Sequence, residues 1–150
     1  NYALSFTNNI FDMKKFKKIL PNKNKIYKIE TKQALLDLKN ILKNGENFLI
    51  DRGDLSKEIS IEMIPVAQRN IINMSKKLKN KKVYVATNFL ESMIENNFAT
   101  RGEVNDIYST LNQGASGLVL AAETAIGRHP IECVKLLKRV FKIYRKNSAQ

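Results

Sequence analysis

The stretch Phe48–Asp54 (FLIDRGD) decides the fold class, because a short apolar run passes there directly into a polar turn. Phe48 to Ile50 has the pattern of a buried strand. Runs of the same character occur at 83–86 and 117–120, and each is followed by polar residues. Longer segments with helical spacing separate these runs. Strands and helices in alternation predict an α/β protein with a parallel sheet and right-handed crossovers.

Five such strand–helix units are expected along the chain. The expected strands are 2–6, 25–29, 48–50, 83–86 and 117–120. The expected helices are 10–20, 33–42, 64–78, 90–95, 103–112 and one that begins at 130. The strands are apolar without clean alternation, which is typical of a sheet covered on both faces. No linker divides the chain, so we expect a single domain over residues 1–150.

Composition sets the broad class of the protein. The chain has 150 residues, of which 43% are hydrophobic, and this is typical of a globular protein with a core. No apolar run is long enough to predict a transmembrane helix, and the first residues do not resemble a signal peptide. The single cysteine, Cys133, excludes an internal disulfide and favours a reducing compartment. We therefore expect a cytoplasmic protein, or an organellar one from which a targeting segment has been removed.

The net charge of +12 would suit nucleic acid, a membrane surface or an anionic metabolite. The basic residues fall mostly in helical segments such as 14–18 and 76–82, and no nucleic-acid motif accompanies them. Solvated helix faces explain this pattern better. We expect neither nucleic acid nor a membrane as a partner.

Polar residues gather where strands end, which is the active-site end of parallel α/β proteins. Lys28 and Glu30 are two residues apart and share one face of a strand, which is costly unless they pair or bind a ligand. Gly53 allows close approach of the backbone, and neighbouring N–H groups could hold a carboxylate or phosphate. Asp54 could join Glu30 as a ligand for Mg²⁺ or Mn²⁺. The alternative is a purely structural Lys28–Glu30 ion pair.

These motifs together resemble the pyruvate kinase family. Tyr27–Glu30 followed by Asp51–Leu55 resembles the family's run KIE … ARGDLG. The further similar segments are Ala3–Phe6 (ASF), Ala86–Met93 (ATQMLESM), Thr100–Glu103 (TRAE) and Gln113–Ala125 (DGAD … LSGETA, and more closely the SAETA form). Their order and spacing hold across nearly the whole chain, so the set is specific although no single motif is.

The resemblance implies a partial TIM (β/α)₈ barrel of about five parallel β/α units. These units correspond to strands four to eight of the catalytic barrel, its C-terminal part, without the lid and the C-terminal regulatory domain. Five strands leave two open edges, so we expect the barrel to be completed by a missing segment or by another subunit in an oligomer.

The implied reaction is glycolytic: phosphoenolpyruvate and ADP give pyruvate and ATP. The resemblance gives Lys28 the role of stabilising the phosphoryl group in transfer, and Glu30 and Asp54 that of binding the divalent cation. The backbone at Gly53 and Asp54 would hold the substrate carboxylate. Thr87 would lie near the carbon that gains a proton. Four further residues would be supporting: Arg52, Glu91, Arg101 and Glu123. Potassium is a further cofactor of the family, but its ligands belong to strands that this chain does not contain.

Several positions depart from the family pattern. Asp51 replaces a small residue, and Ala121 replaces a serine whose hydroxyl lies near the active site. The other departures are Asn88 for Gln, Ala99 for Pro, and Ile126 for a position that is often Lys or another polar residue. Three interpretations follow: part of an active pyruvate kinase, a related barrel that binds phosphoenolpyruvate or pyruvate with altered activity, or a non-catalytic interaction domain.

Overall fold

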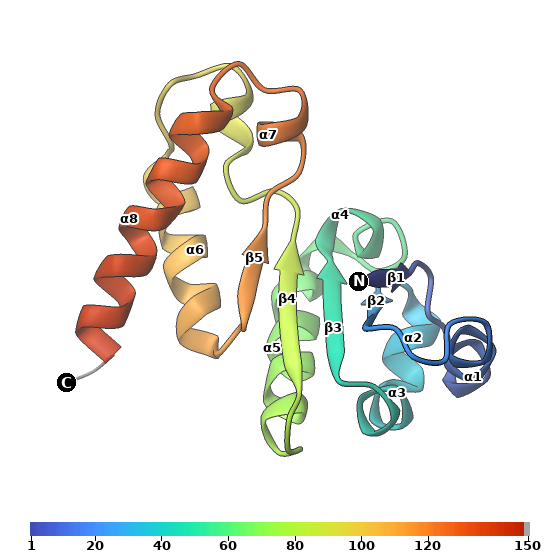
Figure 1. Ribbon diagram of the computed structural model, residues 1–150. Helices are drawn as coiled ribbons and strands as arrows, with labels where there is room; N and C mark the ends of the chain where they lie inside the picture. Colours follow the sequence, from blue (N-terminus) through green and yellow to red (C-terminus); the bar gives the residue numbers. More distant parts are fainter. Residues whose placement is uncertain (149–150) are drawn as a thin grey trace. The chain divides into compact units, whose positions relative to one another are not determined.

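The computed structural model describes residues 1–148 and confirms the alternating α/β architecture (Figure 1). Five strands form a parallel sheet in the order β1-β2-β3-β4-β5. They are β1 (Tyr2–Leu4), β2 (Lys25–Ile29), β3 (Asn47–Asp51), β4 (Lys82–Ala86) and β5 (Gly117–Val119). The chain divides near the end of β4 into two compact units, which we call unit 1 (residues 1–85) and unit 2 (from residue 86 onward).

Unit 1 carries α1 (Ile10–Ile19), α2 (Lys32–Leu36), α3 (Leu38–Asn44), α4 (Arg52–Leu55), the 3₁₀ turn η1 (Ile61–Met63) and α5 (Ile64–Lys76). Its strands β1, β2 and β3 pair in parallel, with Ile26 opposite Asn47 and Ile29 opposite Ile50. Ile29 and Ile50 are fully buried. The two neighbouring strands therefore end at the same level, and the residues that follow them are brought together.

Unit 1 contains an aromatic core centred on Tyr27. The ring of Tyr27 contacts Phe16 edge-on and Phe48 at a tilt, each with centroids 6.2 Å apart. Gly45 closes this core, since a Cβ atom there would lie 2.7 Å from the Phe48 ring and 2.8 Å from that of Tyr27. Only glycine fits this position without displacing a ring.

The expected single helix 33–42 is wrong, because the chain forms α2 and α3 with Asp37 between them. The Asp37 carboxylate accepts hydrogen bonds from the Ile10 amide (3.2 Å) and from the Asn40 side chain (2.6 Å). An aspartate that bonds neighbouring backbone and side-chain donors competes with helix continuation. The same side chain thus ends α2 and contacts the start of α1.

Unit 2 carries η2 (Glu91–Ile94), α6 (Arg101–Gln113), α7 (Ala122–Ala125) and α8 (Pro130–Ser148). The expected α-helix at 90–95 is instead the 3₁₀ turn η2. Helices α6 and α8 run side by side (Figure 1), with Tyr108 and Tyr144 in edge-to-face contact at 5.8 Å. Gly114 ends α6 in the left-handed conformation, φ 102°, as a helix-stopping glycine does.

Cys133 on α8 is fully buried, and its thiol lies 3.7 Å from the carbonyl oxygen of Glu123. Burial, followed by the nearby charge of Glu123, raises the pKa of this thiol above its usual value. The cysteine is therefore a packing residue in unit 2.

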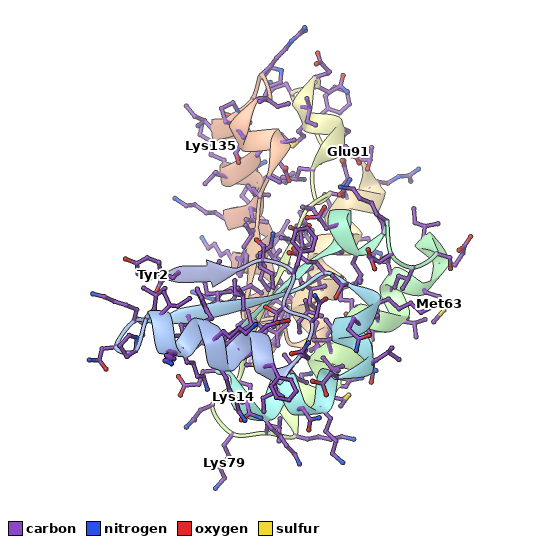
Figure 2. The ribbon with its side chains drawn as sticks, turned by 90° about the vertical axis from the view of Figure 1, so that its right-hand side faces the viewer. Tyr2, Lys14, Met63, Lys79, Glu91 and Lys135 are labelled. Carbon is purple, nitrogen blue, oxygen red and sulfur yellow. The ribbon has the colours of Figure 1, made fainter. Side chains whose placement is uncertain are left out.

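The basic charge lies largely on exposed side chains. Figure 2 shows Lys79, in the turn after α5, extending away from the ribbon; it is exposed, as are most lysines of the helices. Within residues 1–148, no helix combines the length and apolar character that crossing a membrane requires.

Candidate active site

The site of unit 1 is a group of four charged residues that we call the carboxylate–lysine cluster: Lys28, Glu30, Asp51 and Asp54. Lys28 lies on β2, and Glu30 follows that strand directly. Asp51 is the last residue of β3, and Asp54 lies on α4. Because Ile29 pairs with Ile50, the register extended by one residue sets Glu30 beside Asp51. The parallel strands thus deliver all four side chains to one edge of the sheet.

Glu30 is the most buried member of the cluster, with no solvent exposure. One carboxylate oxygen, Oε1, accepts the Phe6 amide at 2.6 Å. The other, Oε2, forms an ion pair with Lys28 Nζ at 2.8 Å and accepts no hydrogen bond besides this contact among the described residues. Phe6 has φ 51°, an uncommon value for a bulky residue. This turn after β1 directs the Phe6 amide to Glu30.

Asp51 contacts two other members of the cluster, Lys28 and Asp54. Its Oδ2 lies 3.0 Å from Lys28 Nζ, and its Oδ1 accepts the Asp54 amide at 3.4 Å. The second contact makes Asp51 the N-cap of α4. Sequence reasoning placed Asp51 among the polar residues after β3 but gave it no role in the site. The signal that could have found it is the matched end of two parallel strands, which sets residues 30 and 51 side by side.

Lys28 is the internal cation of the cluster. Burial alone would lower its pKa, but the hydrogen bonds to Glu30 and Asp51 outweigh that effect and raise the pKa above its usual value. The ammonium group therefore stays charged. One lysine serves two carboxylates here, so the contacts are those of a triad rather than of the simple Lys28–Glu30 pair considered above.

Asp54 lies on the open side of the cluster and pairs with Lys57 at 2.8 Å. The hydrogen bond from Lys57 is the main reason that the pKa of Asp54 lies below its usual value. The Lys57 side chain is 76% exposed, so this pairing is a weak surface contact that a ligand can replace.

The cluster fits a hard divalent cation. Glu30, Asp51 and Asp54 each offer a carboxylate oxygen, and these oxygens lie within 4.8 Å of one another. Such cations take oxygen ligands, and Mg²⁺ retains waters or substrate oxygens in its remaining positions. Glu30 and Asp54 are the two carboxylates that the sequence predicted for this purpose, and both lie in the group.

Thr87 and Asn88 open unit 2 with an unusual backbone. Both have positive φ, 73° and 58°, and for a β-branched residue such as Thr87 this is a true outlier. The Thr87 hydroxyl donates to the Ala86 carbonyl oxygen at 2.6 Å, and its amide donates to that of Val119 at 3.4 Å. Backbone strain of this kind costs about 1–3 kcal/mol and is concentrated at functional sites.

Glu103 and Glu123, two glutamates of unit 2, lie in different environments. Glu103 accepts hydrogen bonds from the amides and hydroxyls of Ser92 and Thr100, at distances of 2.5 to 2.9 Å. Partial burial alone would raise the pKa of Glu103, but these bonds outweigh it and hold the pKa below its usual value. Glu123 is buried: its Oε2 accepts the Ala121 amide at 2.8 Å, while Oε1 has no hydrogen-bond partner among the described residues.

The remaining residues assigned a supporting role differ in their surroundings. Glu91, which Figure 2 labels, accepts a hydrogen bond from the side chain of Asn88 at 2.9 Å. Arg101 is exposed at the start of α6, and Arg52 begins α4. The residue that sequence reasoning missed in unit 2 is Glu103, whose capping box with Thr100 is visible in the sequence as a threonine followed three residues later by glutamate.

Comparisons with known proteins point to the same family over most of the chain. The model of the pyruvate kinase barrel domain matches residues 2–134. The chain belongs to the pyruvate kinase family. A pyruvate kinase of Thermotoga maritima is 47% identical over 145 residues, which cover 94% of this chain and 31% of that protein. Plastidial pyruvate kinase 2 of Arabidopsis thaliana is 36% identical over 143 residues, 93% of this chain and 24% of that protein.

The fold agrees with this membership. The crystal structure of pyruvate kinase from Pyrobaculum aerophilum matches with a TM-score of 0.89 and 32% identity, over 93% of this chain and 32% of that one. The chain therefore has the fold of part of a pyruvate kinase barrel. It spans about a third of the length of the Thermotoga relative and of this structure.

Proposed function

We propose that the chain supplies the lysine and cation-binding part of a pyruvate kinase-type phosphotransferase, which converts phosphoenolpyruvate and ADP to pyruvate and ATP. The observation that carries the proposal is the carboxylate–lysine cluster, in which Lys28 lies 2.8 Å from Glu30 and three carboxylates converge. Membership of the pyruvate kinase family supports the same assignment.

In this proposal Glu30 and Asp54 hold Mg²⁺ or Mn²⁺. The bound cation would supply neutralisation of negative charge on the substrate oxygens. Glu30 is fixed for this role by the Phe6 amide, and Asp54 exchanges its exposed partner Lys57 for the cation. The family also uses K⁺, for which we assign no ligand in this chain.

Lys28 is proposed to stabilise the phosphoryl group in transfer. Its raised pKa keeps it cationic, and a positioned ammonium group stabilises the charge that develops on phosphoryl oxygens. The amides at Gly53 and Asp54, at the start of α4, are proposed to hold the substrate carboxylate. Thr87 is proposed to lie near the carbon that is protonated, and its strained backbone supports a functional role.

We further propose that the five strands correspond to strands four to eight of the family's eight-stranded barrel. The remaining strands would come from a segment outside this chain or from another subunit. We propose the whole of 1–150 as a single functional domain within that barrel, acting in the cytoplasm, with neither nucleic acid nor a membrane as a partner.

A second candidate is a related protein that binds phosphoenolpyruvate or pyruvate through a divalent cation without transfer to ADP. Two departures favour it: Asp51 in place of a small residue, since it engages Lys28 at 3.0 Å, and Ala121, which lacks the hydroxyl found in the family. A pyruvate-formation assay with ADP separates the two candidates once cation binding has been established.

The first test is titration with oxalate, a mimic of enolpyruvate, with and without Mn²⁺. We expect binding that requires Mn²⁺ and that falls by more than tenfold in Glu30→Gln, because one cation ligand loses its charge. The matched control is Glu46→Gln, an exposed glutamate of the same unit at the opposite end of β3. Equal binding by wild type and Glu30→Gln would contradict the proposal and favour a non-catalytic domain.

A further inference from the structure

Asp51 uses both of its carboxylate oxygens on groups that an anionic ligand would also need. Oδ2 lies 3.0 Å from the Lys28 ammonium, and Oδ1 accepts the Asp54 amide at 3.4 Å. The ammonium is a cation and the amide is a backbone N–H donor, and both groups attract carboxylates and phosphates. Asp51 thus contacts these donors as a tethered anion.

Asp51 is less firmly fixed than Glu30, the other carboxylate that contacts Lys28. Glu30 is fully buried and fixed by the Phe6 amide, whereas the Asp51 side chain is 13% exposed. Its oxygens lie within 4.8 Å of those of Glu30 and Asp54. Asp51 therefore lies close enough to act on a cation held by the other two carboxylates.

We propose that Asp51 is a specificity-determining residue of the carboxylate–lysine cluster, which strengthens the binding of a divalent cation and weakens the binding of an anionic ligand at Lys28 and the Asp54 amide. The inference rests on the proposed function of the cluster as a cation and substrate site. It goes further by assigning a role to a residue that takes no part in the reaction proposed above.

The direction of both effects follows from charge. A third carboxylate a few ångströms from the cation adds attraction, and the same charge repels a carboxylate or phosphoryl ligand. The ligand must also displace a competitor that is covalently tethered beside its donors, and tethering gives such a competitor a high effective concentration. A neutral residue at position 51 removes both effects at once.

Asp51 also has a structural role as the N-cap of α4, so the test must separate charge from capping. Asparagine and serine are good N-caps and carry no charge, whereas alanine loses both properties. Asp51→Asn and Asp51→Ser therefore remove the proposed effect while retaining the start of α4. Asp51→Ala reports how much of any change comes from the cap.

The experiment measures Mn²⁺ binding, then oxalate binding at saturating Mn²⁺, for the 150-residue chain and these variants. In Asp51→Asn and Asp51→Ser we expect Mn²⁺ to bind roughly tenfold more weakly and oxalate roughly tenfold more tightly, as one unit charge at this range predicts. Glu46→Gln should change neither. Opposite shifts in the two affinities are the signature, since mere loss of structure would weaken both.

The proposal is overturned if Asp51→Asn binds Mn²⁺ and oxalate as wild type does, or if both affinities fall together. Failure of the proposed function is a different result: wild type then binds Mn²⁺ no better than Glu30→Gln, whatever residue stands at 51. In that case Asp51 acts on no cation, and the specificity role falls with the site.

Discussion

The carboxylate–lysine cluster of unit 1 and the hydrogen bonds around Glu103 in unit 2 both stabilise carboxylate charge, but with different kinds of partner. In unit 1, Glu30 and Asp51 share one cation, Lys28, and lie close to a third carboxylate. In unit 2, Glu103 receives four hydrogen bonds from neutral donors of Ser92 and Thr100. A carboxylate satisfied by local neutral donors holds a loop to a helix. Carboxylates that share one lysine still have oxygen lone pairs that can coordinate a metal cation.

The largest effect is expected from Lys28→Met. Glu30 is fully buried, and removal of the lysine that pairs with it leaves an uncompensated charge, which costs about 3–5 kcal/mol of unfolding free energy. Urea unfolding followed by circular dichroism measures the loss.

Saturating Mn²⁺ should restore part of this stability in Lys28→Met, because the cation takes the place of the ammonium group. Binding at a hundred times the dissociation constant contributes about 2.7 kcal/mol. Mg²⁺ or Mn²⁺ without any stabilising effect on this variant would show that the cluster is a structural ion triad, as Glu103 and its donors are a structural network.

A smaller effect is expected from Glu103→Ala, which removes a capping box together with the contacts to Ser92. We expect a loss of about 2 kcal/mol, of the size of a lost helix cap and its hydrogen bonds, without a change in Mn²⁺ affinity. Glu103→Gln, which can keep part of the capping box, should lose less. A fall in Mn²⁺ affinity comparable to that of Glu30→Gln would break the contrast between the two regions.

The smallest effects concern pH, and the two regions should respond at opposite ends of the scale. The pKa of Glu103 is lowered on folding, so its contribution is present above the unfolded value of about 4.3 and is lost as pH falls through the folded value. The pKa of Lys28 is raised, so its contribution is complete below about 10.4 and is lost as pH rises through the folded value.

Unfolding free energies of wild type, Glu103→Gln and Lys28→Met, measured from pH 3 to pH 11, test this contrast. The difference in unfolding free energy between wild type and Glu103→Gln should become smaller only in acid. The difference between wild type and Lys28→Met should begin to fall in alkali above about pH 10.4. Gaps that stay constant over the whole range would mean that neither charge contributes to stability.

Much of the fold was predictable because local signals and tertiary structure agree. The strand 25–29 and the helix starts at Ile10, Ile64 and Pro130 match the structure. The break at Asp37 was not predictable from periodicity, since it depends on a contact with Ile10 that is distant in sequence. The four-residue helices α4 and α7 are too short to produce a periodic pattern.

The candidate site was predictable in three of its four members, but not in Asp51 or in the pairing. The resemblance pointed to Lys28, Glu30 and Asp54, and the structure sets all three in one cluster. That Lys28 divides its contacts between Glu30 and Asp51 depends on strand register, which a single strand does not encode. The positive φ of Thr87 likewise has no local signal, because threonine rarely adopts it.

The buried Cys133 can serve as a probe of local opening in unit 2. It is the single cysteine of the chain, it is fully enclosed, and its raised pKa disfavours the reactive thiolate. A thiol-labelling reagent can therefore react only when the packing around α8 opens. The rate of labelling measures how often that happens in the native protein, and unit 1, which has no thiol, contributes nothing to the signal.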